Sequence, residues 1–175
     1  MSKQEPIKAM EIHGEKKKIV LAGNPNVGKS VFFNSLTGIY VDVSNFPGTT
    51  VDVSHGHFEE YAVIDTPGVY GISSFNDEEK VARDVILTAD LIVNVVDAVH
   101  LERDLFLSLQ VIETGIPTII VLNMMDDAKR EGLKIDLALL EEQLGVPVIP
   151  AVAIKGKGLK ELKEKLREAR TGNIP

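Results

Sequence analysis

The sequence Gly-Asn-Pro-Asn-Val-Gly-Lys-Ser at residues 23–30 directly follows the apolar run Ile-Val-Leu-Ala at residues 19–22. It fits the phosphate-loop pattern, in which a glycine and four further residues precede Gly-Lys-Ser where a strand turns into a helix. Glycines let backbone N–H groups converge on an anion, while Lys29 reaches the β- and γ-phosphates and the Ser30 hydroxyl suits Mg²⁺. The alternative is a glycine-rich turn that only caps a helix. The match and its strand–helix setting favour a nucleoside triphosphate site.

The composition is that of an ordinary globular domain. The chain has 175 residues, 44% of them hydrophobic, which suits one domain with a full core. Zero cysteines exclude disulfides, thiol catalysis and cysteine-ligated metals. The net charge of −7 argues against broad nucleic-acid binding. No apolar stretch approaches the roughly 18 residues that a membrane helix needs, and the N-terminus lacks a secretory signal.

Strand-like and helix-like segments alternate along the chain. Strands are predicted at residues 18–22, 51–60, 61–64, 91–96, 117–122 and 146–151, helices at 29–37, 77–88, 101–113, 136–144 and 159–170, and loops at 39–50 and 65–76. This order predicts an α/β fold with a mostly parallel, six-stranded sheet and helices on both faces. In such sheets ligands bind beyond the carboxyl ends of the strands.

Asp65, Thr66, Pro67 and Gly68 directly follow an apolar run at residues 62–64. A carboxylate at a strand end can hold Mg²⁺ through water, and the Gly68 N–H can approach a γ-phosphate closely. On its own the tetrapeptide is also a common turn. Its place at a strand end, 35 residues after Ser30, favours contact with phosphate.

The sequence Asn-Met-Met-Asp at residues 123–126 follows another predicted strand. The Asp126 carboxylate can accept both N–H groups on the 2-amino side of guanine, and the Asn123 amide can meet the base from its other edge. Adenine has no exocyclic 2-amino group, so it would leave the carboxylate poorly paired. The alternative is that Asp126 or Asp127 caps a helix.

Thr49 and Thr50 lie in the loop predicted at residues 39–50. A hydroxyl there would complete the coordination of Mg²⁺, tie the loop to the γ-phosphate and release it after hydrolysis. A preference for threonine at the start of a strand is the alternative. The chemistry alone does not choose between the two threonines.

Taken in order, these motifs resemble the P-loop GTPase set, and further stretches narrow the resemblance. They are Asn-Phe-Pro-Gly-Thr-Thr-Val-Asp at residues 45–52, Ala-Arg-Asp at 82–84, Asn-Val-Val-Asp-Ala at 94–98, Leu-Glu-Arg-Asp-Leu at 101–105 and the motif at 123–126. Together they resemble the G domain of the FeoB family of ferrous-iron transporters. The resemblance implies a Ras-like G domain at residues 18–170 and a tail at 171–175 that begins a linker. The polar, charged residues 1–17 are expected to form a flexible lead-in.

The resemblance also implies the members of the site. The residues expected to line a GTP site are Gly23, Asn24, Pro25, Asn26, Val27, Gly28, Lys29, Ser30, Gly48, Thr49, Thr50, Val51, Asp52, Asp65, Thr66, Pro67, Gly68, Asn123, Met124, Met125, Asp126, Val152, Ala153 and Ile154. Ser30, Thr50 and, through water, Asp65 are expected to hold Mg²⁺. The resemblance selects Thr50 rather than Thr49 as the metal-binding threonine.

One departure from the pattern concerns the base-contacting loop. Such GTPases usually have Ser-Ala there, and the matching pair in this chain is Val152 and Ala153. The backbone N–H of Ala153 is expected to donate to the guanine O6. Loss of the serine hydroxyl is expected to loosen this loop and to speed nucleotide exchange.

Another departure concerns catalysis. Many GTPases place a glutamine directly after the Asp-x-x-Gly motif to orient water, whereas this chain has Val69. Intrinsic GTP hydrolysis is therefore expected to be slow, with Lys29, Asn26, Thr50 and Gly68 as the catalytic group. Asn26 resembles the asparagine that ligates K⁺ in cation-activated members of the class, where K⁺ stands in for an arginine finger.

FeoB proteins carry a helical regulatory domain and a transmembrane iron permease after the G domain. Neither is present in these 175 residues, so the chain is expected to be a fragment of an inner (cell) membrane protein, lying on the cytoplasmic side without inserting into the membrane itself. Its partners are expected to be GTP, GDP and the two absent domains. Whether copies form a homo-oligomer is left open by the sequence.

Four further residues could be mistaken for site residues. His55 and His57 lie two apart on a predicted edge strand and share one face, where solvent-facing side chains are expected rather than a metal pair. Asp84 and Asp90 are expected to be helix-surface and capping residues. No residue is a convincing direct iron ligand.

Two other function classes remain open. A free-standing GTPase of ribosome assembly shares the generic motifs, but its members usually add a basic RNA-binding domain that this acidic chain lacks. An ATP-using P-loop enzyme is disfavoured by Asn123 and Asp126. The coding region beyond Pro175 would separate the transporter from the assembly GTPase, since several membrane helices there would favour the former.

Overall fold

The computed structural model describes residues 16–73 and 75–170. Most of the predicted lead-in at residues 1–17 and all of the tail at 171–175 therefore lie outside the described residues. The strands are β1 (Lys18–Gly23), β2 (Asp42–Asn45), β3 (Asp52–Phe58), β4 (Tyr61–Asp65), β5 (Leu91–Asp97), β6 (Thr118–Asn123) and β7 (Val148–Pro150). The helices are α2 (Lys29–Thr37), α3 (Asp77–Ile86), α4 (Leu101–Glu113), α5 (Met125–Arg130), α6 (Leu137–Leu144) and α7 (Leu159–Arg170), with short 3-10 turns η2 (Ala98–His100) and η3 (Ala153–Lys155).

The described strands form one seven-stranded sheet in the order β2-β3-β4-β1-β5-β6-β7. All neighbours from β4 to β7 run parallel, whereas β2 and β3 run antiparallel at one side. The α/β class and the mostly parallel sheet are confirmed, and the count of six strands is wrong by one. The additional strand is β2, which lies within the segment predicted as a loop and pairs with β3.

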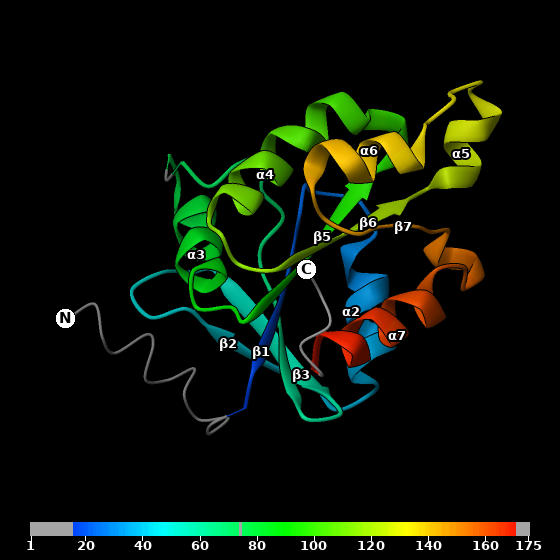
Figure 1. The fold of residues 1–175 in the computed structure, drawn as a ribbon. Coiled ribbons are helices and arrows are strands. Elements are labelled where there is room, and N and C mark those ends of the chain that lie inside the picture. Colours follow the sequence, from blue (N-terminus) through cyan, green and yellow to red (C-terminus); the bar gives the residue numbers. More distant parts are fainter. Residues whose placement is uncertain (1–15, 74, 171–175) are drawn as a thin grey trace.

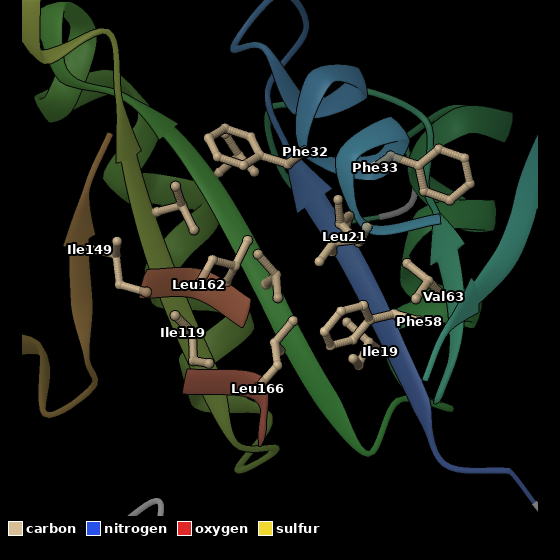
Figure 2. Packing of buried hydrophobic residues seen from close by; sticks show 14 of the residues in the cluster. Ile19, Leu21, Phe32, Phe33, Phe58, Val63, Ile119, Ile149, Leu162 and Leu166 are labelled. Carbon is tan, nitrogen blue, oxygen red and sulfur yellow. The ribbon is translucent and has the colours of Figure 1, made fainter. Parts of the chain in front are cut away.

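Helices cover both faces of the sheet, with α2 and α7 on one side and α3, α4 and α6 on the other (Figure 1). Neighbouring residues of a strand point to opposite faces. In β1, Ile19 and Leu21 therefore meet the α2 and α7 side, and Val20 meets α3 and α4. Figure 2 shows the first of these layers, where Phe32 of α2 and Leu162 of α7 pack over the strands.

Local sequence signals set the first turns of two helices. The Asn76 side chain accepts a hydrogen bond from the Glu79 N–H at the start of α3, and Asp136 caps α6 in the same way through Leu139. The helices predicted at 101–113 and 159–170 are found at those residues. Within the described residues, no helix combines the length and the apolar character needed to cross a lipid bilayer.

Candidate nucleotide-binding site

The predicted motifs meet at the carboxyl ends of adjacent parallel strands. In register, Leu21 of β1 lies beside Asp65 of β4, and Asp97 of β5 lies beside Asn123 of β6. The phosphate loop follows β1 directly, between these neighbours, and leads into α2 (Figure 1). The fold therefore brings residues that are up to about a hundred positions apart in the chain together at the carboxyl ends of the strands.

Close packing explains the two glycines of the phosphate loop. A Cβ on Gly23 would lie 2.8 Å from the Val95 carbonyl oxygen, and a Cβ on Gly28 would lie 2.5 Å from the Asn123 Nδ2. Gly28 also has a φ of +87°, and the non-glycine residue Asn26 has a φ of +66°. Successive backbone groups in such conformations form concave nests for anions. The loop thus has the backbone shape that a phosphate site requires.

We expect Gly28→Ala to destabilise the fold and to disturb the site. An L-residue at this φ costs about 1–2 kcal/mol, and the overlap with Asn123 adds about 1–3 kcal/mol. Gly145→Ala is the matched control, because Gly145 has a φ of +69° but a Cβ added to it would meet nothing within 4 Å. Urea unfolding should show a larger loss for the Gly28 variant. Equal losses in the two variants would contradict the proposed role of the overlap.

The Lys29 side chain pairs with Asp65. Its Nζ donates to the Asp65 carboxylate and to the Thr66 carbonyl oxygen, and the Lys29 and Asp65 side chains are 11% and 18% exposed. Burial raises the pKa of Asp65 above its ordinary value, and the charge and hydrogen bond of Lys29 offset part of that shift. A cation and a carboxylate thus share a sheltered position at the base of the phosphate loop.

The segment from Asp65 to Gly68 packs against the phosphate loop. A Cβ on Gly68 would lie 2.9 Å from the Pro25 Cα, and the Val69 N–H donates to the Gly23 carbonyl at 3.1 Å. The Thr66 hydroxyl donates to the Leu21 carbonyl at 2.7 Å, so this side chain anchors the segment to β1. The segment is therefore more than a local turn, because long-range contacts fix it beside the loop.

Asn123 joins the phosphate loop to the loop after β7. Its Nδ2 donates to the Val27 carbonyl at 2.9 Å, and its Oδ1 accepts from the Ala153 N–H at 3.0 Å. The side chain is 3% exposed. The structure thus gives Ala153 a different partner from the one expected, because its N–H is already donated to Asn123. The next residue, Ile154, is 83% exposed.

Asp126 lies in the first turn of α5 and does not cap it. Met124, with a left-handed backbone, holds the N-cap position without a side-chain hydrogen bond, so capping by Asp126 or Asp127 is wrong. The Asp126 Oδ2 lies 3.4 Å from the Lys155 Nζ and 3.8 Å from an Arg130 nitrogen. These contacts hold the carboxylate at the edge of the site, beside η3.

The two threonines of the 39–50 loop differ in their hydrogen bonds. The Thr49 hydroxyl donates to the Phe46 carbonyl at 2.8 Å and accepts from the Val51 N–H at 3.1 Å, so it closes a local turn. Thr50 and Ser30 are exposed. The Thr49 hydroxyl is therefore used in this turn, which is consistent with Thr50 rather than Thr49 as the expected Mg²⁺ ligand.

The remaining predicted members have these positions. Asn24 and Val27 are buried, Gly48 and Asp52 are exposed, Val51 and Val152 are buried, and Pro67, Met124 and Met125 are half-buried.

Of the four residues set apart from the site, Asp84 lies on α3, Asp90 directly precedes β5, and His55 and His57 lie on β3. Asp84 contacts Arg83 on the surface of α3. Asp90 accepts a hydrogen bond from the Lys18 N–H of β1 at 2.8 Å, so it contacts a strand end rather than capping a helix. His55 is half-buried and His57 exposed. Their placement on an edge strand is wrong, because β2 lies outside β3.

Two contributors to this region are not among the residues predicted from the sequence. Lys155 approaches Asp126 from another loop, and a lysine in a polar loop carries no distinguishing signal. Asp104 is 1% exposed and accepts a hydrogen bond from Asn24 at 2.8 Å. Its signal was an acidic residue on the buried face of an amphipathic helix.

Known proteins match this chain across nearly all of its described part. The family model described as Ferrous iron transport protein B matches residues 17–166. The Fe(2+) transporter FeoB of Escherichia coli (strain K12) is 42% identical over 159 residues, as is that of Shigella flexneri. Each match covers 85% of this chain and 21% of the relative. The chain thus spans about a fifth of the length of these relatives.

Solved structures agree with the sequence match. The FeoB G-domain from Methanococcus jannaschii is 41% identical with a TM-score of 0.74, covering 87% of this chain and 96% of that one. A mutant of S. thermophilus NFeoB bound to GDP is 43% identical with a TM-score of 0.84, covering 91% of this chain and 65% of that one. The chain therefore belongs to the Ferrous iron transport protein B family and has the fold of its G domain.

Proposed function

We propose that this chain binds GTP and hydrolyses it to GDP and phosphate. The observation that carries the proposal is the Asn123 side chain, which ties the phosphate loop at Val27 to the loop at Ala153. This link joins the phosphate loop to the loop that contacts Asp126 through Lys155, which supports one continuous site for a phosphate chain and a base. The GDP-bound relative from S. thermophilus, with 43% identity, supports the same reading.

The phosphate end of the site uses Lys29 and hard oxygen donors. Lys29 leaves Asp65 to contact the β- and γ-phosphates, which frees the Asp65 carboxylate to hold metal-bound water. The exposed hydroxyls of Ser30 and Thr50 complete a donor set that fits Mg²⁺, a cation that prefers oxygen ligands. When bound, Mg²⁺ neutralises charge on the phosphates.

The base end of the site selects guanine. The Asp126 carboxylate accepts the N1 and 2-amino N–H groups, which adenine cannot offer together, so ATP is disfavoured. The Ala153 N–H donates to Asn123 and is not available to the base. We therefore assign the hydrogen bond to the guanine O6 to the N–H of the next residue, Ile154. The link to Asn123 also restrains the loop after β7 without help from a serine hydroxyl.

Hydrolysis depends on few groups and is slow. Val69 is 3% exposed and packs into the apolar layer under α3 and α4, so it neither reaches nor orients water. The Gly68 N–H is left to approach the γ-phosphate. Asn26 is exposed at the rim of the loop, where its amide oxygen suits a K⁺ ion. Turnover then depends on the monovalent cation.

We expect GTP turnover to be about tenfold faster in K⁺ than in Na⁺, because a cation at the γ-phosphate replaces an arginine finger. Asn26→Ala should reduce turnover in K⁺ to the rate in Na⁺. The rate of the same variant in Na⁺ is the control and should equal that of the wild type. Release of inorganic phosphate measures all four rates. Equal wild-type rates in the two salts, or an alanine variant that keeps full stimulation, would contradict the assignment.

The proposed role in the whole protein is supported by the relatives, which are Fe(2+) transporters about four times as long as this chain. The chain is the cytoplasmic regulatory domain of such a transporter, and its nucleotide state signals through the loops at 39–50 and 67–76 to a helical domain and a permease. The direct test of the activity is phosphate release from GTP and from ATP with Mg²⁺. Release from ATP at the rate seen with GTP would overturn the proposal.

A further inference from the structure

The buried carboxylate of Asp104 on α4 contacts the phosphate loop but is not among the residues expected to line the GTP site. The Asp104 side chain is 1% exposed and accepts three hydrogen bonds from three parts of the chain. Oδ1 accepts from the Asn24 Nδ2 at 2.8 Å and from the Arg103 Nε at 2.9 Å, and Oδ2 accepts from the Asp97 N–H at 2.9 Å. A carboxylate this deeply buried is tolerated only where donors surround it.

The first donor belongs to the phosphate loop. Asn24 lies between Gly23 and Pro25 and is 2% exposed. Its amide is oriented by Asp104, because turning it over would bring its oxygen against the carboxylate. Within residues 16–73 and 75–170, Oδ1 of Asn24 has no hydrogen-bond partner, so the bond to Asp104 is its side-chain anchor. Asp104 thus fixes the loop at its second residue.

The second donor, Arg103, contacts the loop after Gly68. The Arg103 guanidinium lies 5.6 Å from the centre of the Tyr70 ring, within cation–π range. The following residues of this loop are held by the same helix, because the Gln110 side chain accepts from the Ile72 N–H at 2.8 Å and donates to Ser73. One helix therefore holds both loops that face the phosphates.

The helix itself has a fixed position relative to β1. Asn94 of β5 donates to the Ala22 carbonyl at 3.2 Å, immediately before the phosphate loop, and accepts from the Ser108 hydroxyl of α4. Both side chains are buried. Because polar contacts specify one arrangement more strictly than apolar packing, Asp104 is presented to Asn24 at a defined place.

We propose that Asp104 is a positioning residue, which holds the phosphate loop through Asn24 and the Tyr70 loop through Arg103. The inference rests on the proposed GTPase function. Loss of the Asn24 contact loosens the loop around bound phosphates and speeds the release of GDP. Loss of the Arg103 contact loosens the loop that approaches the γ-phosphate, so it lowers kcat for GTP without speeding the release of GDP.

The test measures the dissociation rate of N-methylanthraniloyl-GDP from the 175-residue chain, together with kcat, KM and the unfolding midpoint without nucleotide. The variants are Asp104→Asn, Asn24→Ala, their double variant and Arg103→Ala. Glu102→Ala is the matched control, because it removes an exposed acidic residue from the same first turn of α4.

Asp104→Asn and Asn24→Ala should each speed dissociation about tenfold, as expected for a hydrogen bond to a charged group. The double variant should match the faster single variant, since both remove one contact. Arg103→Ala should lower kcat roughly two- to tenfold with dissociation unchanged, and Glu102→Ala should match the wild type.

A purely structural role would lower the unfolding midpoints and leave dissociation within about twofold of the wild type, which would overturn the inference alone. Additive effects in the double variant would also overturn it. Failure of the wild-type chain to bind the GDP probe would instead overturn the proposed function on which the inference rests.

Discussion

Lys29→Ala is expected to weaken the binding of GTP by at least roughly 100-fold and to reduce hydrolysis below detection. Truncating one partner of a sheltered, charge-assisted contact costs about 2–5 kcal/mol, and about 2.7 kcal/mol corresponds to a 100-fold change. The side chain is 11% exposed in its pair with Asp65, so its ammonium group is kept near the phosphate loop before nucleotide arrives. Titration calorimetry with GTP measures the loss.

The control for this variant is Lys160→Ala, which removes an exposed lysine from α7. It should bind GTP as the wild type does. Because Lys29→Ala leaves the buried Asp65 without its cation, the unfolding midpoint of each variant should be measured as well. A folded Lys29→Ala chain that keeps GTP affinity within about threefold of the wild type would contradict the role given to Lys29.

Asp126→Asn is expected to weaken the binding of guanine nucleotides by about 100-fold and to strengthen the binding of xanthine nucleotides. The carboxamide keeps the shape of the side chain but places an N–H₂ group where the guanine amine lies, and leaving a polar pair unmatched is a strong discriminator. Xanthine has a carbonyl at that position, so it accepts from the new amide. Calorimetric titration of the variant with GDP and with xanthosine diphosphate measures the two affinities and shows which base is preferred.

Asp127→Asn provides a matched control for Asp126→Asn. Asp127 is the neighbouring carboxylate, its side chain is 45% exposed, and it pairs with Arg130 on the surface of α5. Its variant should keep the preference for guanine. A loss of guanine affinity in both variants alike would show that charge near α5, rather than a contact to the base, determines binding.

The sequence predicts the parts of this fold whose signals are local. The phosphate loop, the alternation of apolar strands and amphipathic helices, and the glycine at 145 that ends α6 are all legible in short windows. The strand β2 is not, because its four residues are exposed and its existence depends on pairing with β3. A short strand of exposed, mostly polar residues leaves no periodic apolar pattern to detect.

The candidate site shows the same division. The phosphate-loop pattern indicates Lys29. Asp65 and Asn123 are indicated because each is polar where an apolar strand ends. Which group bonds to which is decided by the tertiary structure, so the donation of the Ala153 N–H to Asn123 could not be predicted. The role of Asp104 was equally hidden, since its partner Asn24 lies 80 positions away.

We propose that the carboxyl ends of these strands form a site for guanine nucleotides, and its selectivity for the base can be measured in solution. Titration calorimetry of the wild-type chain with GDP and with ADP, both in Mg²⁺, compares two ligands that differ only in the base. We expect one GDP to bind per chain and ADP to bind at least about 100-fold more weakly. Binding of ADP with the affinity of GDP, or no binding of GDP, would contradict it.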